Sequence, residues 1–268
     1  MKSPLRYPGG KTRAIKTLTS MIDQHFNGKR YSKMLSPFCG GCSFEFVLLD
    51  MFKSSKFVFA DLFKPLIIFW QQCMTNKNSL IELLTDSVGN IDKEQFQQIR
   101  NELIKHVDDE DPILIAAYYF IINRCSFSGS TFSGGFSQEA AMKRFTKSSV
   151  SNIERLKFNK NVSFLCQSFE TTLTNINEND FIFADPPYHL NEKSKLYGIN
   201  GDLHENFNHQ LFHDTMESLN CDYIITYNDD EYIRTLYHNH VIISASWSYG
   251  MNKSHQSSEI IILSKQTS

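Results

Sequence analysis

Short apolar runs alternate with longer segments of helical periodicity in the first 75 residues and again after residue 160. Runs of this kind are typical of buried strands. The strands expected on this basis are residues 34–38, 56–60, 162–166, 181–184, 223–227, 241–243 and 259–263. Helices are expected from about residue 43, through residues 66–70 and near residues 207–219. Because helix follows strand repeatedly, the sheet is predicted to be mostly parallel and doubly wound, with a C-terminal antiparallel hairpin formed by the last two strands.

The central part of the chain does not follow this alternation. Leucines recur at helical spacing from residue 80, and residues 111–122 are apolar enough for a buried helix. Residues 123–138 are rich in serine and glycine and predict a long loop. We therefore expect one α/β domain made of residues 1–75 and 155–268, interrupted by a mainly helical insertion of residues 76–154.

Composition narrows the class of protein. The chain has 268 residues, 41% of them hydrophobic, and no apolar run long enough to predict a transmembrane helix. No apolar stretch follows the first residues, so no signal peptide is expected, and the six cysteines then indicate a reducing compartment, the cytoplasm. Cys39 and Cys42 form a C-x-x-C, but no second close pair follows. Zinc or redox chemistry is therefore not favoured, and no metal site is expected.

Charge is unevenly distributed along the chain, although the formal net charge is only −2. Residues 1–33 carry eight basic side chains against one acid, and residues 123–160 carry seven against two. Residues 78–112 carry nine acids against three basic side chains. This asymmetry is compatible with a basic face for a polyanion and an acidic face turned away from it, although solvated surface charge alone would look the same.

Two segments near the first strands are suited to a cofactor. Residues 36–43 place a glycine turn between a strand and a helix, where free backbone N–H groups can face an anionic group. A tight turn without any ligand explains this segment equally well, because it matches no complete dinucleotide or phosphate motif. Asp61 ends the next strand, about 20 residues after the turn, which is the position of acids that bind ribose hydroxyls. Capping of the following helix is the alternative role for Asp61.

The tetrapeptide Asp185-Pro186-Pro187-Tyr188 follows the apolar run 181–184. A buried strand that ends here brings a carboxylate, a stiff turn and an aromatic ring to the ligand-binding edge of the sheet. Proline has no N–H donor, so the Pro186 carbonyl is expected to be free to accept a hydrogen bond beside the Asp185 carboxylate. Two hydrogen-bond acceptors suit a flat base that carries an amino group, and Tyr188 can stack on the ring of that base. A proline turn with a packed tyrosine is the plainer reading.

The N-terminal segment Leu5-Arg6-Tyr7-Pro8-Gly9-Gly10-Lys11 precedes a helix. With this segment, the four motifs together resemble, in order, the alpha-class, Dam-type DNA adenine-N6 methyltransferases. The resemblance extends from residue 5 to about residue 235 and includes Asn123-Arg124-Cys125-Ser126-Phe127-Ser128-Gly129, with the segments 133–137 and 144–146, which are most like phage and prophage members. It implies a Rossmann-like, S-adenosylmethionine-dependent methyltransferase sheet with an inserted, mainly helical target-recognition domain.

The resemblance also implies the roles of particular residues. The catalytic set is Asp185, Pro186, Pro187 and Tyr188. The residues expected to bind S-adenosylmethionine are Tyr7, Pro8, Gly9, Gly10, Lys11, Pro37, Phe38, Cys39, Gly40, Gly41, Cys42, Ser43, Asp61, Leu62, Ser168, Phe169 and Asp185. Those expected to contact double-stranded DNA are Lys11, Asn123, Arg124, Ser126, Phe127, Ser128, Ser133, Lys143, Arg144 and Lys147, with Arg124 the foremost candidate. Three positions depart from the family pattern: Ser36 and Ser168 stand where acids are common, and Cys42 stands where a glycine or small residue is common.

The implied reaction is methyl transfer to the N6 amine of an adenine that has flipped out of a specific DNA sequence, in a modification enzyme that works alone or beside a restriction endonuclease. Residues 189–206 are expected to form a lid. Two alternatives remain open: an adenine methyltransferase acting on RNA and a catalytically silent nucleic-acid-binding protein. A nicotinamide dehydrogenase is disfavoured because the chain lacks a full dinucleotide fingerprint. Methylation of a glutamine side chain is disfavoured because enzymes of that kind have Asn at the position of Asp185.

Overall fold

The computed structural model describes residues 1–108, 110–189, 207–248 and 256–265. The expected lid lies outside the described residues, apart from His189. The strands are β1 (Lys33–Ser36), β2 (Lys56–Asp61), β3 (Val162–Cys166), β4 (Asp180–Ala184), β5 (Asp222–Asn228), β6 (Val241–Ser248) and β7 (Gln256–Leu263). The α-helices are α1 (Ile15–His25), α2 (Glu45–Met51), α3 (Lys64–Thr75), α4 (Lys77–Ser87), α5 (Lys93–His106), α6 (Pro112–Cys125), α7 (Gln138–Lys143), α8 (Lys147–Glu154), α9 (Phe169–Thr172), α11 (His209–Glu217) and α12 (Glu231–Leu236). Two 3₁₀ turns complete the list, η1 (Lys11–Arg13) and η2 (Phe127–Gly129).

The seven strands form one sheet in the order β3-β2-β1-β4-β5-β7-β6. The first five are parallel, whereas β7 pairs antiparallel with both β5 and β6. The predicted fold class, a mostly parallel sheet with a C-terminal antiparallel hairpin, is therefore confirmed. The strand order reverses between β1 and β4, and ligands of open α/β sheets bind at the carboxyl ends of the strands at such a point.

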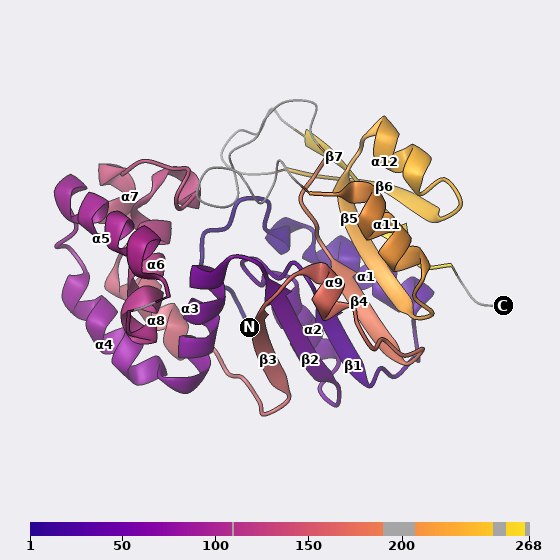
Figure 1. The fold of residues 1–268 in the computed structure, drawn as a ribbon, viewed down its shortest axis with the longest axis horizontal. Helices are drawn as coiled ribbons and strands as arrows, with labels where there is room; N and C mark the ends of the chain where they lie inside the picture. The colour runs from indigo at the N-terminus through magenta and orange to yellow at the C-terminus, as the bar shows by residue number, and fades with distance from the viewer. Residues whose placement is uncertain (109, 190–206, 249–255, 266–268) are drawn as a thin grey trace.

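Each face of the sheet is covered by helices, because strands of a parallel sheet bury both faces. Side chains of α1, α2, α3 and α6 belong to one apolar cluster with Phe57, Phe59 and Phe183. Side chains of α9, α11 and α12 pack on the other face, around Ile182 and Ile225. Helices α4 to α8 gather at one end of the sheet, beyond β3 (Figure 1). Their side chains belong to the same apolar cluster as those of α3 and the sheet, so the division of the chain into two domains stays a prediction.

The chain departs from the expected pattern in the central segment. Helix α6 extends through Cys125, and η2 follows it, so part of the expected long loop is helical. Within this extension the Asn123 side chain bonds the distant Arg6 backbone, a tertiary contact that local composition does not reveal. The strands β6 and β7 are also longer than their apolar runs, since their outer halves pair with each other.

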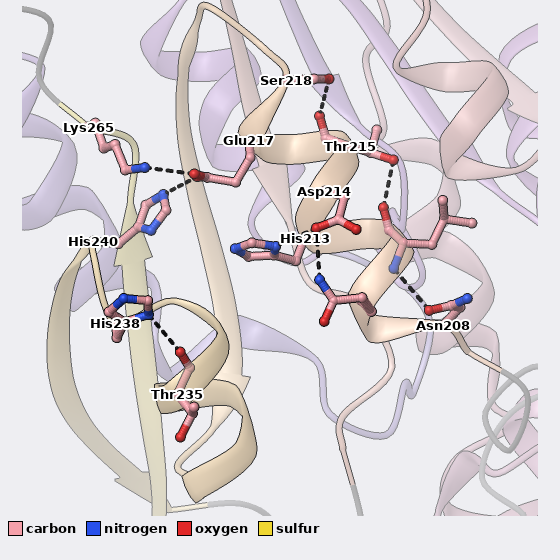
Figure 2. Close-up of polar contacts among 12 residues, drawn as sticks. Asn208, His213, Asp214, Thr215, Glu217, Ser218, Thr235, His238, His240 and Lys265 are labelled. Carbon is pink, nitrogen blue, oxygen red and sulfur yellow. Dashed lines mark hydrogen bonds and ion pairs between the residues drawn. The ribbon is translucent and has the colours of Figure 1, made fainter.

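Polar contacts fix the C-terminal hairpin to the helical layer. The Glu217 carboxylate at the end of α11 lies between His240, which precedes β6, and Lys265, which follows β7 (Figure 2). The Glu217–His240 distance is 2.7 Å and the Glu217–Lys265 distance is 2.6 Å. These contacts at the far end of the hairpin help to hold the register of β7 against β5. That register matters because the first half of β7 reaches the ligand-binding edge of the sheet.

Candidate active site

Polar side chains follow apolar ones on a single face of the sheet, at the edge where the parallel strands end. Successive residues of a strand alternate between faces, so residues two apart share one face. Phe59, Met34, Phe183, Ile224 and Ile261 belong to one buried cluster. The residues two positions nearer the edge are Asp61, Ser36, Asp185, Thr226 and Glu259. The fold thus collects a row of polar side chains from β2, β1, β4, β5 and β7 above a continuous apolar core.

Lys11 lies at the centre of a group of polar side chains that we call the catalytic corner: Lys11, Asp185, Tyr188, Thr226 and Glu259. The Lys11 ammonium donates to Asp185 Oδ2 at 2.7 Å, to the Tyr188 hydroxyl at 2.8 Å and to the Gly9 carbonyl at 3.0 Å. Only 3% of the Lys11 surface is exposed. These contacts give Lys11 a part in holding Asp185 and Tyr188. Its predicted contacts with cofactor and DNA stay predictions.

The other oxygen of Asp185 is held from the neighbouring strand. Thr226 Oγ1 donates to Asp185 Oδ1 at 2.7 Å, and Thr226 is fully buried. The β4–β5 register pairs Ala184 with Ile225, which brings the next residue of each strand together. With Lys11 on one oxygen and Thr226 on the other, the carboxylate plane is fixed, while each oxygen retains a lone pair for a ligand.

Two hydrogen bonds hold the Tyr188 hydroxyl. The hydroxyl accepts from Lys11 and donates to Glu259 Oε2 at 2.7 Å. Glu259 is 1% exposed, and its carboxylate lies 3.9 Å from the Lys11 ammonium. Sequence reasoning missed both Thr226 and Glu259, because neither adjoins a motif. A single acid at the start of the apolar run 259–263 was the one available signal for Glu259.

The glycine turn after β1 is packed against the N-terminal segment. A Cβ on Gly40 would lie 2.7 Å from the Tyr7 ring, and one on Gly41 would lie 2.6 Å from Tyr7 Cβ. Glycine is therefore required at both positions because the protein's own tyrosine lies against the backbone. Trp70 Nε1 donates to the Gly40 carbonyl at 3.0 Å and fixes the turn from below. Cys42 has φ 53°, which explains why glycine is favoured at this place.

Asp61 connects the turn to the next strand. Its carboxylate accepts from the backbone N–H of Gly40 at 3.0 Å and of Phe63 at 2.9 Å. Burial raises the pKa of Asp61 to about 6, against the lowering effect of these backbone bonds. Phe63, the N-cap residue of α3, has no side-chain cap of its own, so Asp61 contributes to the start of that helix as well as to the turn. Both roles are compatible with a further hydrogen bond to a ligand.

Glu45, the first residue of α2, is a buried acid that sequence reasoning did not select. It is 3% exposed and accepts from Ser36 Oγ at 2.9 Å. Burial raises its pKa to about 8, partly offset by hydrogen bonds from the backbone and from Ser36, and Asp185 raises it further. Ser36, which departs from the family pattern, is thus paired with a carboxyl group supplied by the following helix.

The remaining residues predicted to bind the cofactor lie along the same edge. Ser168 caps α9, and the buried Phe169 ring lies 5.9 Å from that of Phe38. Leu62 is more than half exposed beside Asp61. Pro8, Gly9, Gly10, Pro37, Cys39 and Ser43 belong to the two packed segments around Tyr7 and the glycine turn. The structure therefore brings the expected cofactor residues to one edge, although their contacts with a ligand stay predictions.

The residues predicted to contact DNA fall into two groups. Asn123 and Ser126 are fully buried, and the Asn123 amide holds the Arg6 backbone and the Gly129 carbonyl. The Arg124 guanidinium donates to the carbonyls of Pro4 and Arg144. The exposed group consists of Phe127, Ser128, Ser133, Lys143, Arg144 and Lys147. The contacts give the first group a role in holding the loop, and DNA contact by either group stays a prediction.

Across the described ranges, no group of three or more His, Cys, Asp or Glu side chains could hold a metal ion. Cys39 and Cys42 are buried free thiols, and burial raises the pKa of Cys39 to about 11. No helix within the described part of the chain has the length and apolar character needed to cross a membrane.

The strand order with its antiparallel C-terminal pair, together with the sequence motifs at the sheet edge, places the chain in the class of S-adenosylmethionine-dependent methyltransferases. The sequence profile of the D12 class N6 adenine-specific DNA methyltransferases matches residues 7–251. The chain belongs to this family, so the enzyme is an adenine-specific DNA methyltransferase whose cofactor is S-adenosylmethionine and whose substrate is DNA. The predicted family, enzyme class and cofactor are confirmed.

Two type II methyltransferases are similar to this chain over about three quarters of its length. The chain is 24% identical over 211 residues to the type II methyltransferase M.MjaIII of Methanocaldococcus jannaschii, covering 73% of this chain and 72% of the relative. It is 24% identical over 214 residues to the type II methyltransferase M1.LlaDCHI of Lactococcus lactis subsp. cremoris, covering 76% and 71%. Among solved structures, the magnesium protoporphyrin IX methyltransferase of Synechocystis with bound cofactor is similar with a TM-score of 0.39 and 8% identity, over 96% of this chain and 80% of that one.

Proposed function

We propose that this enzyme methylates the N6 amine of an adenine that has left the DNA stack, and that Asp185 and the Pro186 carbonyl grip that amine. The observation that carries the proposal is the Asp185 carboxylate, held by Lys11 at 2.7 Å and by Thr226 at 2.7 Å beside the packed glycine turn. A carboxylate fixed in this way cannot rotate away from a ligand. Pro187 stiffens the turn that presents both acceptors.

The residues of the corner explain how a poor nucleophile can react. The lone pair of an adenine amine is delocalised into the ring. When Asp185 and Pro186 accept its two hydrogens, the nitrogen is favoured in a pyramidal form whose lone pair is localised. Positive charge develops on that nitrogen as the new N–C bond forms, so a fixed carboxylate stabilises the transition state more than the ground state. With S-adenosylmethionine bound, its sulfur would keep the electron pair of the broken methyl–sulfur bond, and the nitrogen would release one proton to water to leave the neutral methylated amine.

S-adenosylmethionine, when bound, supplies a methyl group on a positively charged sulfur. The residues that fit this cofactor are those around the glycine turn. Asp61 is proposed to accept from ribose hydroxyls, and the backbone of residues 38–43 to face the methionine part. The Asp61 and Asp185 carboxylates lie along this edge of the sheet, and their negative charge suits a cationic ligand.

Flipping a base out of a duplex costs a few kcal/mol of stacking and pairing. Stacking on the Tyr188 ring is proposed to return about 1–3 kcal/mol of this cost.

The insertion of residues 76–154 is proposed to read the DNA. Its exposed group, from Phe127 to Lys147, is proposed to contact the duplex, since basic side chains position the phosphates and small polar ones can reach base edges. We further propose that the enzyme acts in the cytoplasm of a bacterial or phage-infected cell, alone or with a restriction endonuclease.

One experiment separates this proposal from its alternatives. The purified enzyme is incubated with S-adenosylmethionine labelled in the methyl group and with duplex DNA, single-stranded DNA or RNA of matched sequence. We expect label in 6-methyladenine of the duplex, and sequencing of methylated bases then gives the recognition site. Preferred labelling of RNA would favour an RNA enzyme. Binding of duplex without any label would favour a silent nucleic-acid-binding protein.

A further inference from the structure

Glu259 is a buried carboxylate that the proposed chemistry does not use. It lies on β7, opposite Asn228 of β5 and Ala245 of β6. Each residue after it in β7, from Ile260 to Leu263, is a buried aliphatic side chain. The antiparallel direction of β7 brings its first half to the same edge at which the parallel strands end. The one acid of this strand therefore meets the Asp-Pro-Pro-Tyr segment.

The contacts of Glu259 act on Tyr188. The tyrosine hydroxyl accepts from Lys11 at 2.8 Å and donates to Glu259 Oε2 at 2.7 Å. A phenol has one hydrogen to donate, so this bond settles where the hydroxyl hydrogen points. Because the oxygen lies at the tip of the ring, two partners that approach it from different directions restrain the position of the ring.

This arrangement is unfavourable for stability alone. Removing a carboxylate from water costs several kcal/mol, and replacing a buried ion pair with apolar side chains of similar volume is often neutral or stabilising. Three ionisable groups, Lys11, Asp185 and Glu259, nevertheless meet within hydrogen-bond or ion-pair distance at this edge. Because the neighbouring residues of β7 are buried and aliphatic, an aliphatic side chain at residue 259 would avoid the cost of burying a charge.

We propose that Glu259 is a positioning residue of the base pocket, which fixes the Tyr188 ring in the plane on which the target adenine stacks. The inference rests on the proposed function, because it takes Tyr188 as the stacking platform. Glu259 acts through Tyr188 and does not itself touch the base. Misplacement of a reacting group by about 1 Å can cost a factor of about 100 in rate, so a loosened platform affects methyl transfer more than binding.

The test measures single-turnover methyl transfer to a duplex that carries the site methylated by the wild-type enzyme. Glu259→Leu is expected to lower the rate constant about 10- to 100-fold. Its dissociation constant for S-adenosylmethionine should stay within about twofold of wild type. Glu259→Gln keeps an acceptor for the hydroxyl and is expected to lose less than about fivefold. Ser258→Ala, an exposed neighbour on the same strand, is the matched control and should transfer at the wild-type rate.

A double-mutant cycle decides whether the effect passes through the tyrosine. In a Tyr188→Phe background the further change Glu259→Leu should alter the rate less than about twofold. An equal loss in both backgrounds, or a folded Glu259→Leu enzyme with the wild-type rate, overturns the proposal. If Glu259→Leu does not fold, Tyr188→Phe must itself show a loss of about tenfold with unchanged cofactor binding, or the inference is wrong. Absence of methylation by the wild-type enzyme would instead reject the proposed function.

Discussion

The catalytic corner and residues 123–138, which include the end of α6 and which we call the recognition loop after their proposed role, differ in how far their side chains are exposed. In the corner, the Lys11 ammonium is 3% exposed and donates to Asp185, Tyr188 and Gly9. In the recognition loop, Phe127 is 69% exposed, and Ser128 and Thr131 adopt positive φ angles of 55° and 44°. Groups whose hydrogen bonds are made within the protein can hold one another in place. Exposed groups on a constrained backbone are suited to contact a partner.

The two regions meet in the N-terminal segment. The Arg6 backbone forms two hydrogen bonds with the buried Asn123 amide, at 2.9 and 2.7 Å, and a Cβ on Gly129 would meet the Arg6 carbonyl at 2.5 Å. The next residue, Tyr7, lies against the glycine turn. Residues 6–11 therefore contact the recognition loop, the glycine turn and the catalytic corner within six consecutive positions. This proximity gives a physical reason why a short N-terminal motif accompanies the other motifs of the family.

The largest expected effect is that of breaking the corner at Asp185. Asp185→Ala removes the charge that we propose stabilises the developing cation, and we expect a loss of at least about 1,000-fold in the single-turnover rate constant. Cofactor binding, measured by calorimetry, should be reduced far less, since the glycine turn and Asp61 remain. Methylation at a rate near that of wild type would contradict the role of Asp185.

Lys11→Met tests whether the corner is held together by a buried cation. The change leaves the Asp185 and Glu259 carboxylates close together without the ammonium between them. Loss of one partner from a buried pair is strongly destabilising, and we expect the free energy of unfolding in urea to fall by about 3 kcal/mol. The double variant Lys11→Met/Glu259→Gln should recover part of this loss, because it removes one of the two repelling charges. Equal stability of wild type and Lys11→Met would show that Lys11 does not hold the two carboxylates in solution.

Sequence reasoning predicted the sheet and the contiguous motifs because local patterns determine both. The run 181–184 and the tetrapeptide after it gave the strand, its end and the acid in one segment. The same reasoning placed Asp61 at the edge, since the acid directly ends an apolar run. In contrast, the last turn of α6, through Cys125, lies where Asn123 contacts Arg6, more than a hundred residues away in the chain, and no local pattern predicts that contact.

The parts of the site that were missed depend on pairing between distant strands. Thr226 reaches Asp185 only because β5 lies beside β4, and Glu259 reaches Tyr188 only because β7 reverses direction next to β5. Neither pairing is encoded near those residues. Arg124 was selected as a DNA contact because of its charge and motif, but whether its donors are used within the protein depends on where the Pro4 and Arg144 carbonyls lie.

Glu45 provides a pH test of the buried acids beside the corner. Its pKa, about 8, lies above the ordinary value of 4.5, so the folded state binds the proton more tightly than the unfolded state. Stability is therefore expected to fall as pH rises from about 5 to 8, the interval between the two values. In urea unfolding without cofactor, wild type should lose about 2 kcal/mol more than Glu45→Gln between pH 6 and 8. Parallel curves for the two proteins would show that Glu45 is solvated or already ionised.

The smallest expected effects concern two arginines of the insertion and would sharpen the contrast within it. Arg124 donates to the Pro4 and Arg144 carbonyls, whereas the Arg144 side chain is exposed. Burial, with the nearby Arg6 and Arg144, lowers the pKa of Arg124 to about 10. We expect Arg144→Ala to weaken duplex binding several-fold and to reduce the slope of log affinity against log salt by about 1, as loss of one phosphate contact does. Arg124→Ala should instead lower the free energy of unfolding by about 1–2 kcal/mol, since hydrogen bonds from a charged group to carbonyls are lost.

The salt slope distinguishes the two roles, because a residue that only holds the loop can weaken binding without changing the number of ions released. Arg124→Ala should therefore show an unchanged slope even where its affinity is lower. Lys143→Ala is a suitable comparison, since Lys143 is exposed and pairs with Glu139 one helical turn away, at 3.1 Å. If Arg124→Ala reduced the slope by about 1 and altered the methylated sequence, Arg124 would be a direct DNA contact, and its hydrogen bonds to the two carbonyls would have to open when DNA binds.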